Sequence, residues 1–197
     1  IRECIGCNIC VMGDWTHTPI QCTQNPTMGE EWRRGWHPEN MNRKGHSNRI
    51  LVVGAGPAGL EAAMSLGRRG YEVALADTNE GGGRVVKEAG LPGLSVWRRV
   101  VDYRLGQIEK LNQVTFYPGS HMDRDSIFSY GAEHVAIATG SRWRQDGLGR
   151  ANWESLEGIA DPGSVFTPDD LVEGNLPVAG PVVIYDDDHY YRGGHTR

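Results

Sequence analysis

All four cysteines of the chain lie near its start, three of them in a C-x2-C-x2-C run and the fourth after a loop. Each of four thiolates can hold one iron of a cubane, and iron–sulfur clusters take four-cysteine ligation of this kind. Small Gly6 lets the backbone of the run pass close to the inorganic sulfurs. The spacing therefore predicts a [4Fe–4S] cluster held by Cys4, Cys7, Cys10 and Cys22.

Two other uses of these thiols stay open. Zinc is the main alternative, although structural zinc sites usually take their ligands as two separated pairs, and a third cysteine three residues after the second fits that pattern poorly. Disulfides are a weaker alternative, because nothing in the sequence suggests secretion. Thiolates kept for a metal cluster imply a reducing compartment, so we expect a cytoplasmic protein.

A second candidate functional motif is the glycine-rich hexapeptide GAGPAG at residues 54–59. It follows an apolar run of strand length at residues 49–53 and opens a helix expected over residues 57–69. A G-x-G-x-x-G loop in this position is the fingerprint of dinucleotide binding. The first glycine permits the tight turn, the second lets the backbone approach a pyrophosphate, and the third allows close helix–strand packing. The helix N-terminus supplies free N–H groups and a partial positive charge to the phosphates.

The next predicted strand, residues 71–76, ends at Asp77 and completes a βαβ unit. We expect Asp77 to accept a hydrogen bond from an adenosine ribose hydroxyl, and its charge disfavours a 2′-phosphate, so NADP is not expected here. FAD, ADP and NAD remain open, and so does a glycine-rich turn that binds nothing. The predicted nucleotide-binding residues comprise the loop, this acid and two further glycine turns: Gly54, Gly56, Pro57, Ala58, Gly59, Asp77, Gly82, Gly83, Thr139 and Gly140.

The remaining pattern predicts an α/β fold with a mostly parallel sheet. Further strands are expected at residues 114–117, 134–138 and 181–185, and further helices at 96–112 and just after Thr167. Residues 1–47 are rich in Gly, Pro, Asn and Trp and are expected to form loops rather than helices. We expect a [4Fe–4S] segment at 1–47, a Rossmann-like FAD/NAD(P)-binding-type domain at 48–178, and the start of a second nucleotide-fold subdomain at 179–197.

The composition of the chain argues against certain classes of binding partner. The chain has 197 residues, 39% of them hydrophobic, and a net charge of -5, which argues against nucleic acid and gives no basic face for anionic lipid. No window has the apolar length of a membrane span, and no signal-peptide pattern opens the chain. The first residue is not Met, and the other end follows directly on a strand-like run, so we expect an internal piece of a longer protein, truncated at both ends.

Several long motifs resemble one known family: CIGCNIC, CTQNPTMGEEWRRGWHP, ILVVGAGPAGLEAA and YGAEHVAIATGSRW. The chain is similar over nearly its whole length to the iron–sulfur flavoproteins typified by trimethylamine and dimethylamine dehydrogenases, with the 2,4-dienoyl-CoA reductases as more distant relatives. This resemblance implies an upstream TIM barrel of roughly 250 residues that binds FMN and carries the catalytic residues. It also implies that the four cysteines take electrons singly from FMN, and that the glycine loop and Asp77 hold ADP or FAD.

By resemblance, the chain is the electron-relay and nucleotide-binding part of an FMN/[4Fe–4S] oxidoreductase. The whole protein is expected to demethylate a methylated amine oxidatively, to pass the electrons to an electron-transferring flavoprotein or similar acceptor, and to form a homo-oligomer. This stretch alone is expected to be inactive. An NAD(P)H-dependent 2,4-dienoyl-CoA or enoate reductase of the same family is one alternative. A stand-alone electron carrier or nucleotide-binding module is another.

Two departures from the family pattern bear on the nucleotides. The interval from Asp77 to the Gly82-Gly83 pair is one residue shorter than the family usually has. In addition, the reductases carry a second glycine loop for NADPH after the last predicted strand, where this chain has Asp186, Asp187 and Asp188. A carboxylate ~5 Å from a phosphate charge costs roughly 3 kcal/mol at an effective dielectric constant near 20. We therefore predict that no NAD(P)H binds at this second position.

Overall fold

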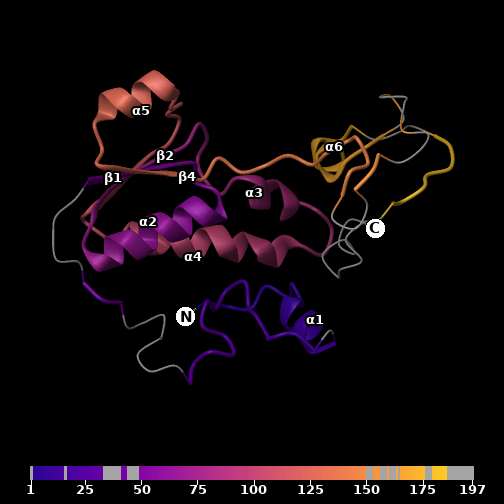
Figure 1. Ribbon diagram of the computed structural model, residues 1–197, viewed down its shortest axis with the longest axis horizontal. Coiled ribbons are helices and arrows are strands. Elements are labelled where there is room, and N and C mark those ends of the chain that lie inside the picture. Colours follow the sequence, from indigo (N-terminus) through magenta and orange to yellow (C-terminus); the bar gives the residue numbers. More distant parts are fainter. Residues whose placement is uncertain are drawn as a thin grey trace. The chain divides into compact units, whose positions relative to one another are not determined.

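The computed structural model describes residues 2–15, 17–32, 41–43, 49–149, 153–155, 159, 163, 165–175 and 179–185. The chain divides into two compact units, Ile1–Gly6 with Gln24–Gly140 and Cys7–Thr23 with Ser141–Arg197. The first unit contains the sheet and most of the helices (Figure 1). The domain boundaries expected after residues 47 and 178 remain a prediction.

Four parallel strands form one sheet in the order β3-β2-β1-β4. They are β1 (Arg49–Val53), β2 (Glu72–Ala76), β3 (Val114–Tyr117) and β4 (His134–Ile137). The central strands β1 and β2 are buried at every position after the first, as continuous apolar runs in a sheet covered on both faces should be. The predicted α/β fold with a parallel sheet is confirmed.

Helices α2 (Pro57–Arg69) and α4 (Arg99–Ile108) cover one face of the sheet (Figure 1). Pro57 stands at the start of α2, where its fixed φ suits a helix and its missing N–H costs nothing. Gly70 ends α2 in the left-handed conformation, with φ of 95°. The predicted bounds of this helix are therefore correct. Its buried residues Leu60, Ala63 and Met64 belong to the main core, which also includes residues of the sheet and of α4.

Helix α5 (Arg124–Tyr130) lies on the opposite face of the sheet (Figure 1). Asp123 caps it by accepting a hydrogen bond from the backbone N–H of Ser126 at 2.8 Å. A smaller apolar cluster joins Leu51 and Val53 of the sheet to Ile127 of this helix. In the described part of the chain, no helix has the length and apolar character required to cross a bilayer.

The structure corrects several predicted elements. The strand expected at residues 181–185 is absent: this segment has no regular structure and pairs with none of the four strands, and its Val183 is 91% exposed. An apolar run forms a strand only where a neighbour satisfies its backbone groups. The helix expected over 96–112 is shorter, because a 3-10 turn, η1 (Ser95–Arg98), precedes α4 and the helix ends at Ile108.

Three short helices were not predicted, namely α1 (Ile9–Trp15), α3 (Arg84–Glu88) and α5. Helix α1 lies in the stretch that was expected to hold only loops, so that expectation is wrong at this point. Helix α6 (Pro168–Glu173) forms where it was predicted. Thr167 caps it, and the carboxylate of Asp170 accepts a hydrogen bond from the Thr167 backbone N–H, which completes a capping box.

Candidate functional site

The glycine loop between β1 and α2 is a place of very close backbone packing. Gly54 has φ of +100°, and a Cβ added to it would lie 2.3 Å from the carbonyl oxygen of Ala138. A Cβ on Gly59 would lie 1.8 Å from the carbonyl oxygen of Gly54. Real side chains do not tolerate such distances, so both positions require glycine for the roles assigned to them, the tight turn and the helix–strand contact.

Gly56 differs from these two glycines, because an added Cβ there would meet nothing within 4 Å. It is the N-cap of α2 and has an extended backbone conformation. Pro57 and Ala58, which open the helix, are exposed. The thirteen-residue helix α2 therefore presents its N-terminal N–H groups, and the positive end of its dipole, at an accessible surface.

Two further turns lie against this loop. The backbone N–H of Gly82 donates to the carbonyl oxygen of Ala55 at 2.7 Å, and a Cβ on Gly83 would lie 3.0 Å from the Cα of Gly56. The shorter interval after Asp77 thus still brings this pair of glycines to the loop. The nitrogen of Thr139 lies 3.1 Å from the position of an added Gly54 Cβ, and Gly140 follows it with φ of +80°.

Asp77 fixes the loop from the end of β2. Its Oδ2 accepts a hydrogen bond from the backbone N–H of Ala55 at 2.6 Å, and its Oδ1 accepts one from the N–H of Asn79 at 2.8 Å. Its Oδ1 also accepts from Nδ2 of Asn79 at 3.5 Å, whereas Oδ2 has a second lone pair that keeps capacity for a ribose hydroxyl. That contact remains a prediction. The predicted nucleotide residues thus meet beyond the carboxyl ends of β1, β2 and β4, where open parallel sheets bind their ligands.

The four cysteines are distributed over both units. Cys4 belongs to the unit that contains the sheet, and Cys7, Cys10 and Cys22 belong to the other. No disulfide joins these four described cysteines, and Cys10 lies in the first turn of α1. Among the residues that the structure describes, no three or more His, Cys, Asp or Glu side chains come together as a group able to hold a metal ion. The four-cysteine cluster site stays a prediction.

The surroundings of two of these sulfurs nevertheless suit metal-bound thiolates. The backbone N–H of Gly6 donates to the Sγ of Cys4 at 3.4 Å, and Gly6 has φ of +66°, a conformation that favours glycine. The Sγ of Cys7 lies 3.1 Å from the Oγ1 of Thr23. Hydrogen bonds to ligand sulfurs are a regular part of iron–sulfur sites. The donor chemistry therefore fits a thiolate-bound metal.

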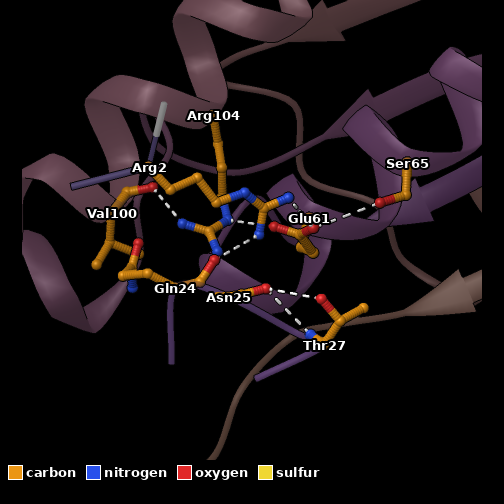
Figure 2. A network of polar contacts seen from close by, with 8 residues as sticks. All are labelled: Arg2, Gln24, Asn25, Thr27, Glu61, Ser65, Val100 and Arg104. Atoms are coloured by element: carbon orange, nitrogen blue, oxygen red, sulfur yellow. Dashed lines mark hydrogen bonds and ion pairs between the residues drawn. The ribbon is translucent and has the colours of Figure 1, made fainter. Parts of the chain in front are cut away.

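A network of ion pairs centred on Glu61 joins the Cys4 segment to the helices (Figure 2). Glu61 lies on α2, and its two oxygens accept from two different arginines: Oε1 from Nη2 of Arg2 at 2.7 Å, and Oε2 from Nε of Arg104 at 2.8 Å. Ser65, one turn further along α2, donates to Oε1 at 3.4 Å. One carboxylate therefore connects residue 2 to both α2 and α4.

Both arginines have further partners. Arg104 is 4% exposed and donates to the carbonyl oxygen of Val100 at 2.8 Å. Burial lowers the pKa of Arg104, while the adjacent Glu61 carboxylate raises it. Arg2 donates to the carbonyl oxygen of Gln24 at 3.1 Å and lies 5.5 Å from the ring centroid of Tyr103. These contacts hold the segment around Gln24 to the same helices (Figure 2).

Arg99, near the start of α4, contacts the cysteine segment directly. Its Nη1 donates to the backbone carbonyl of Cys4 at 3.2 Å, and its Nε pairs with Glu3 at 3.0 Å. None of these charged residues stands out as functional in the sequence. The one residue that could have indicated the network is Arg104, because it lies in the buried stripe of α4. The other members of this stripe are Val100, Val101 and Ile108. A buried arginine on an apolar helix face requires an acidic partner.

The profile of one protein family, described as pyridine nucleotide-disulphide oxidoreductase, matches residues 48–157, more than half of the chain. The chain belongs to the pyridine nucleotide-disulphide oxidoreductase family. The matched residues include all four strands, the glycine loop and Asp77. The Rossmann-like character predicted from the glycine motif is thereby confirmed.

Individual relatives extend the likeness over the cysteine segment. Dimethylamine dehydrogenase of Hyphomicrobium sp. (strain x) is 44% identical over 97% of this chain. The solved structure of histamine dehydrogenase from Rhizobium sp. 4-9 is 55% identical over 99% of the chain, with a TM-score of 0.87. That of 6-hydroxypseudooxynicotine amine oxidase from Pseudomonas geniculata N1 is 47% identical over 100%, with a TM-score of 0.90.

The predicted resemblance to the amine dehydrogenases is confirmed by these relatives, which are oxidoreductases. The chain spans 27% of the dimethylamine dehydrogenase and 29% of each of the two solved proteins.

Replacement of Gly59 by Ala should abolish binding of ADP and FAD, because the new Cβ would collide with the carbonyl oxygen of Gly54 and push α2 off the loop. Overpacking of this kind usually costs about 1–3 kcal/mol, and a backbone obstacle places it at the upper end. Gly106→Ala is the matched control: it lies within α4, and its Cβ would meet nothing within 4 Å. Isothermal titration calorimetry should show loss of nucleotide binding in Gly59→Ala only. Unchanged binding in this variant would contradict the assigned role.

Replacement of Glu61 by Gln should loosen the Cys4 segment, because Arg2 and Arg104 would then face each other without the carboxylate between them. Loss of one partner from a buried pair costs about 3–5 kcal/mol, and the 31% exposure of the Glu61 side chain places this change at the lower end. Hydrogen exchange should become faster in α2, α4 and residues 2–6. The control is Asp102→Asn on α4, which breaks an exposed pair with Arg98 of η1 and should cost under about 0.5 kcal/mol. Equal exchange rates in both variants would refute the role given to Glu61.

Proposed function

We propose that this chain is the electron-relay and nucleotide-binding part of an FMN/[4Fe–4S] oxidoreductase that oxidises an amine. One observation carries this proposal: the likeness to amine-oxidising enzymes covers 97% or more of the chain, including the cysteine segment, whereas the family profile begins only at residue 48. The family profile thus covers the nucleotide fold without the four cysteines. The combination of such a fold with the preceding cysteines points to a relay between two redox centres.

The nucleotide site is proposed to hold ADP or FAD. Gly54 and Gly59 give the loop its shape, Gly56 leaves its backbone open to a pyrophosphate, and the N-terminus of α2 offers N–H groups and a partial positive charge. Asp77 stands beside the loop as an acceptor for ribose hydroxyls. Its negative charge acts against a 2′-phosphate, which favours these nucleotides over NADP.

The metal centre is proposed to be a [4Fe–4S] cluster held by Cys4, Cys7, Cys10 and Cys22, with zinc as the alternative. When bound, such a cluster accepts and releases single electrons. The chain's own residues also contact two of the sulfurs: the backbone N–H of Gly6 donates to the Sγ of Cys4, and the Thr23 hydroxyl lies 3.1 Å from the Sγ of Cys7. The Arg99 contact to the Cys4 carbonyl holds the first ligand against α4.

The flavin and the substrate are proposed to bind in the part of the protein that precedes this chain. Methylated amines are the proposed substrate class, and the names of the relatives widen it to amines such as histamine. The electrons are proposed to leave through an electron-transferring flavoprotein. The whole protein is proposed to be a cytoplasmic homo-oligomer. The acidic residues Asp186, Asp187 and Asp188, which favour an external acceptor over NAD(P)H, lie outside the described residues.

Steady-state assays of the full-length protein test this function. We expect dimethylamine, trimethylamine or histamine to drive reduction of an electron-transferring flavoprotein or a dye without any NAD(P)H. Residues 1–197 alone should show no amine-dependent reduction, because the flavin is proposed to bind outside these residues. An NADPH-dependent reduction of 2,4-dienoyl-CoA without amine oxidation would instead establish the reductase alternative. Absence of both activities in a flavin-loaded, metal-loaded protein would favour a stand-alone carrier.

A further inference from the structure

The hydroxyl of Thr23 lies 3.1 Å from the Sγ of Cys7, and both residues belong to the same compact unit. The distance is within hydrogen-bonding range for a sulfur acceptor. In a free thiol either atom can donate. A metal-bound thiolate carries no proton, so in the loaded protein the Thr23 hydroxyl is the donor and the Cys7 sulfur is the acceptor.

Hydrogen bonds to ligand sulfurs, together with cluster charge and solvent exposure, set the reduction potential of an iron–sulfur cluster. Reduction adds one electron, and part of that negative charge spreads onto the thiolate sulfurs. A donor aimed at such a sulfur stabilises the reduced state more than the oxidised state, because its partial positive charge faces the added charge. Loss of the donor should therefore lower the potential.

We propose that Thr23 is a positioning residue that raises the potential of the cluster through the sulfur of Cys7. This inference rests on the proposed [4Fe–4S] function of the four cysteines. Thr23 follows Cys22 directly, so one short segment supplies both a ligand and a hydrogen-bond donor to the ligand at Cys7. During reduction one electron enters the cluster from the flavin, and Thr23 keeps its proton and breaks no bond.

The chain offers a matched control for this role. Thr18 lies in the same unit, and its hydroxyl donates to the backbone carbonyl of Gly13 at 3.4 Å rather than to a sulfur. Thr→Val keeps the shape of the side chain and removes the hydroxyl at either position. Thr23→Ser keeps the hydroxyl and tests rescue by a conservative variant.

Potentiometric titration of the full-length holoprotein, followed by the paramagnetic signal of the reduced cluster, is the test. In Thr23→Val the reduced-to-oxidised ratio at a fixed potential should fall about tenfold, which is ~59 mV for a one-electron couple. Thr18→Val and Thr23→Ser should titrate close to the wild type. A Thr23→Val protein that keeps its cluster and the wild-type potential would falsify the inference.

A second variant covers the case in which valine prevents cluster assembly. Thr23→Ala also lacks the hydroxyl and has less bulk, and it should show the same fall in potential. If neither variant retains iron while Thr18→Val does, the inference is overturned, because Thr23 then acts in assembly. A wild-type protein without iron and sulfide overturns the cluster proposal itself. An intact wild-type cluster with an unmoved Thr23→Val potential overturns only the role of Thr23.

Discussion

A single carboxylate, that of Glu61, holds the segment with the first predicted metal ligand to the nucleotide fold. It accepts from Arg2 on one oxygen and from Arg104 on the other, at 2.7 and 2.8 Å. An arginine that is only 4% exposed cannot stay charged at low cost without such a partner. Because Glu61 lies on α2, the helix that starts at the glycine loop also fixes Arg2, two residues before Cys4. Helix α2 thereby contacts both the glycine loop and the segment that leads to Cys4.

The glycine loop is the second feature on which the structure depends, and the roles of its glycines could be derived from the sequence. The order of strand, G-x-G-x-x-G, helix and acid predicted β1, α2 and β2 with nearly correct bounds, because these segments are buried and their pattern is continuous. The reasons assigned to Gly54 and Gly59 agree with the contacts that a Cβ would make there. At Asp77 the structure adds a bond to the N–H of Ala55, so the acid shapes the loop itself.

Other features of the structure could not be predicted from the sequence, and each has its own physical reason. Residues 181–185 have the composition of a strand but pair with no strand among the described residues, and composition cannot reveal pairing. Helices α1, α3 and α5 have only five to seven residues, too short for a periodic pattern. The Glu61 network joins positions 2, 61 and 104, and long-range pairing of common charged residues leaves no local signal.

The relatives and the fold together describe an oxidoreductase unit whose redox role depends on what the four cysteines bind. Metal and acid-labile sulfide analysis of the anaerobically purified full-length protein, with paramagnetic resonance after reduction, measures this directly. Four iron and four sulfide per chain, with a cluster signal on reduction, are the result expected for [4Fe–4S] ligation by four thiolates. One zinc per chain, without sulfide or signal, would contradict it and leave a nucleotide-binding fold with a structural metal.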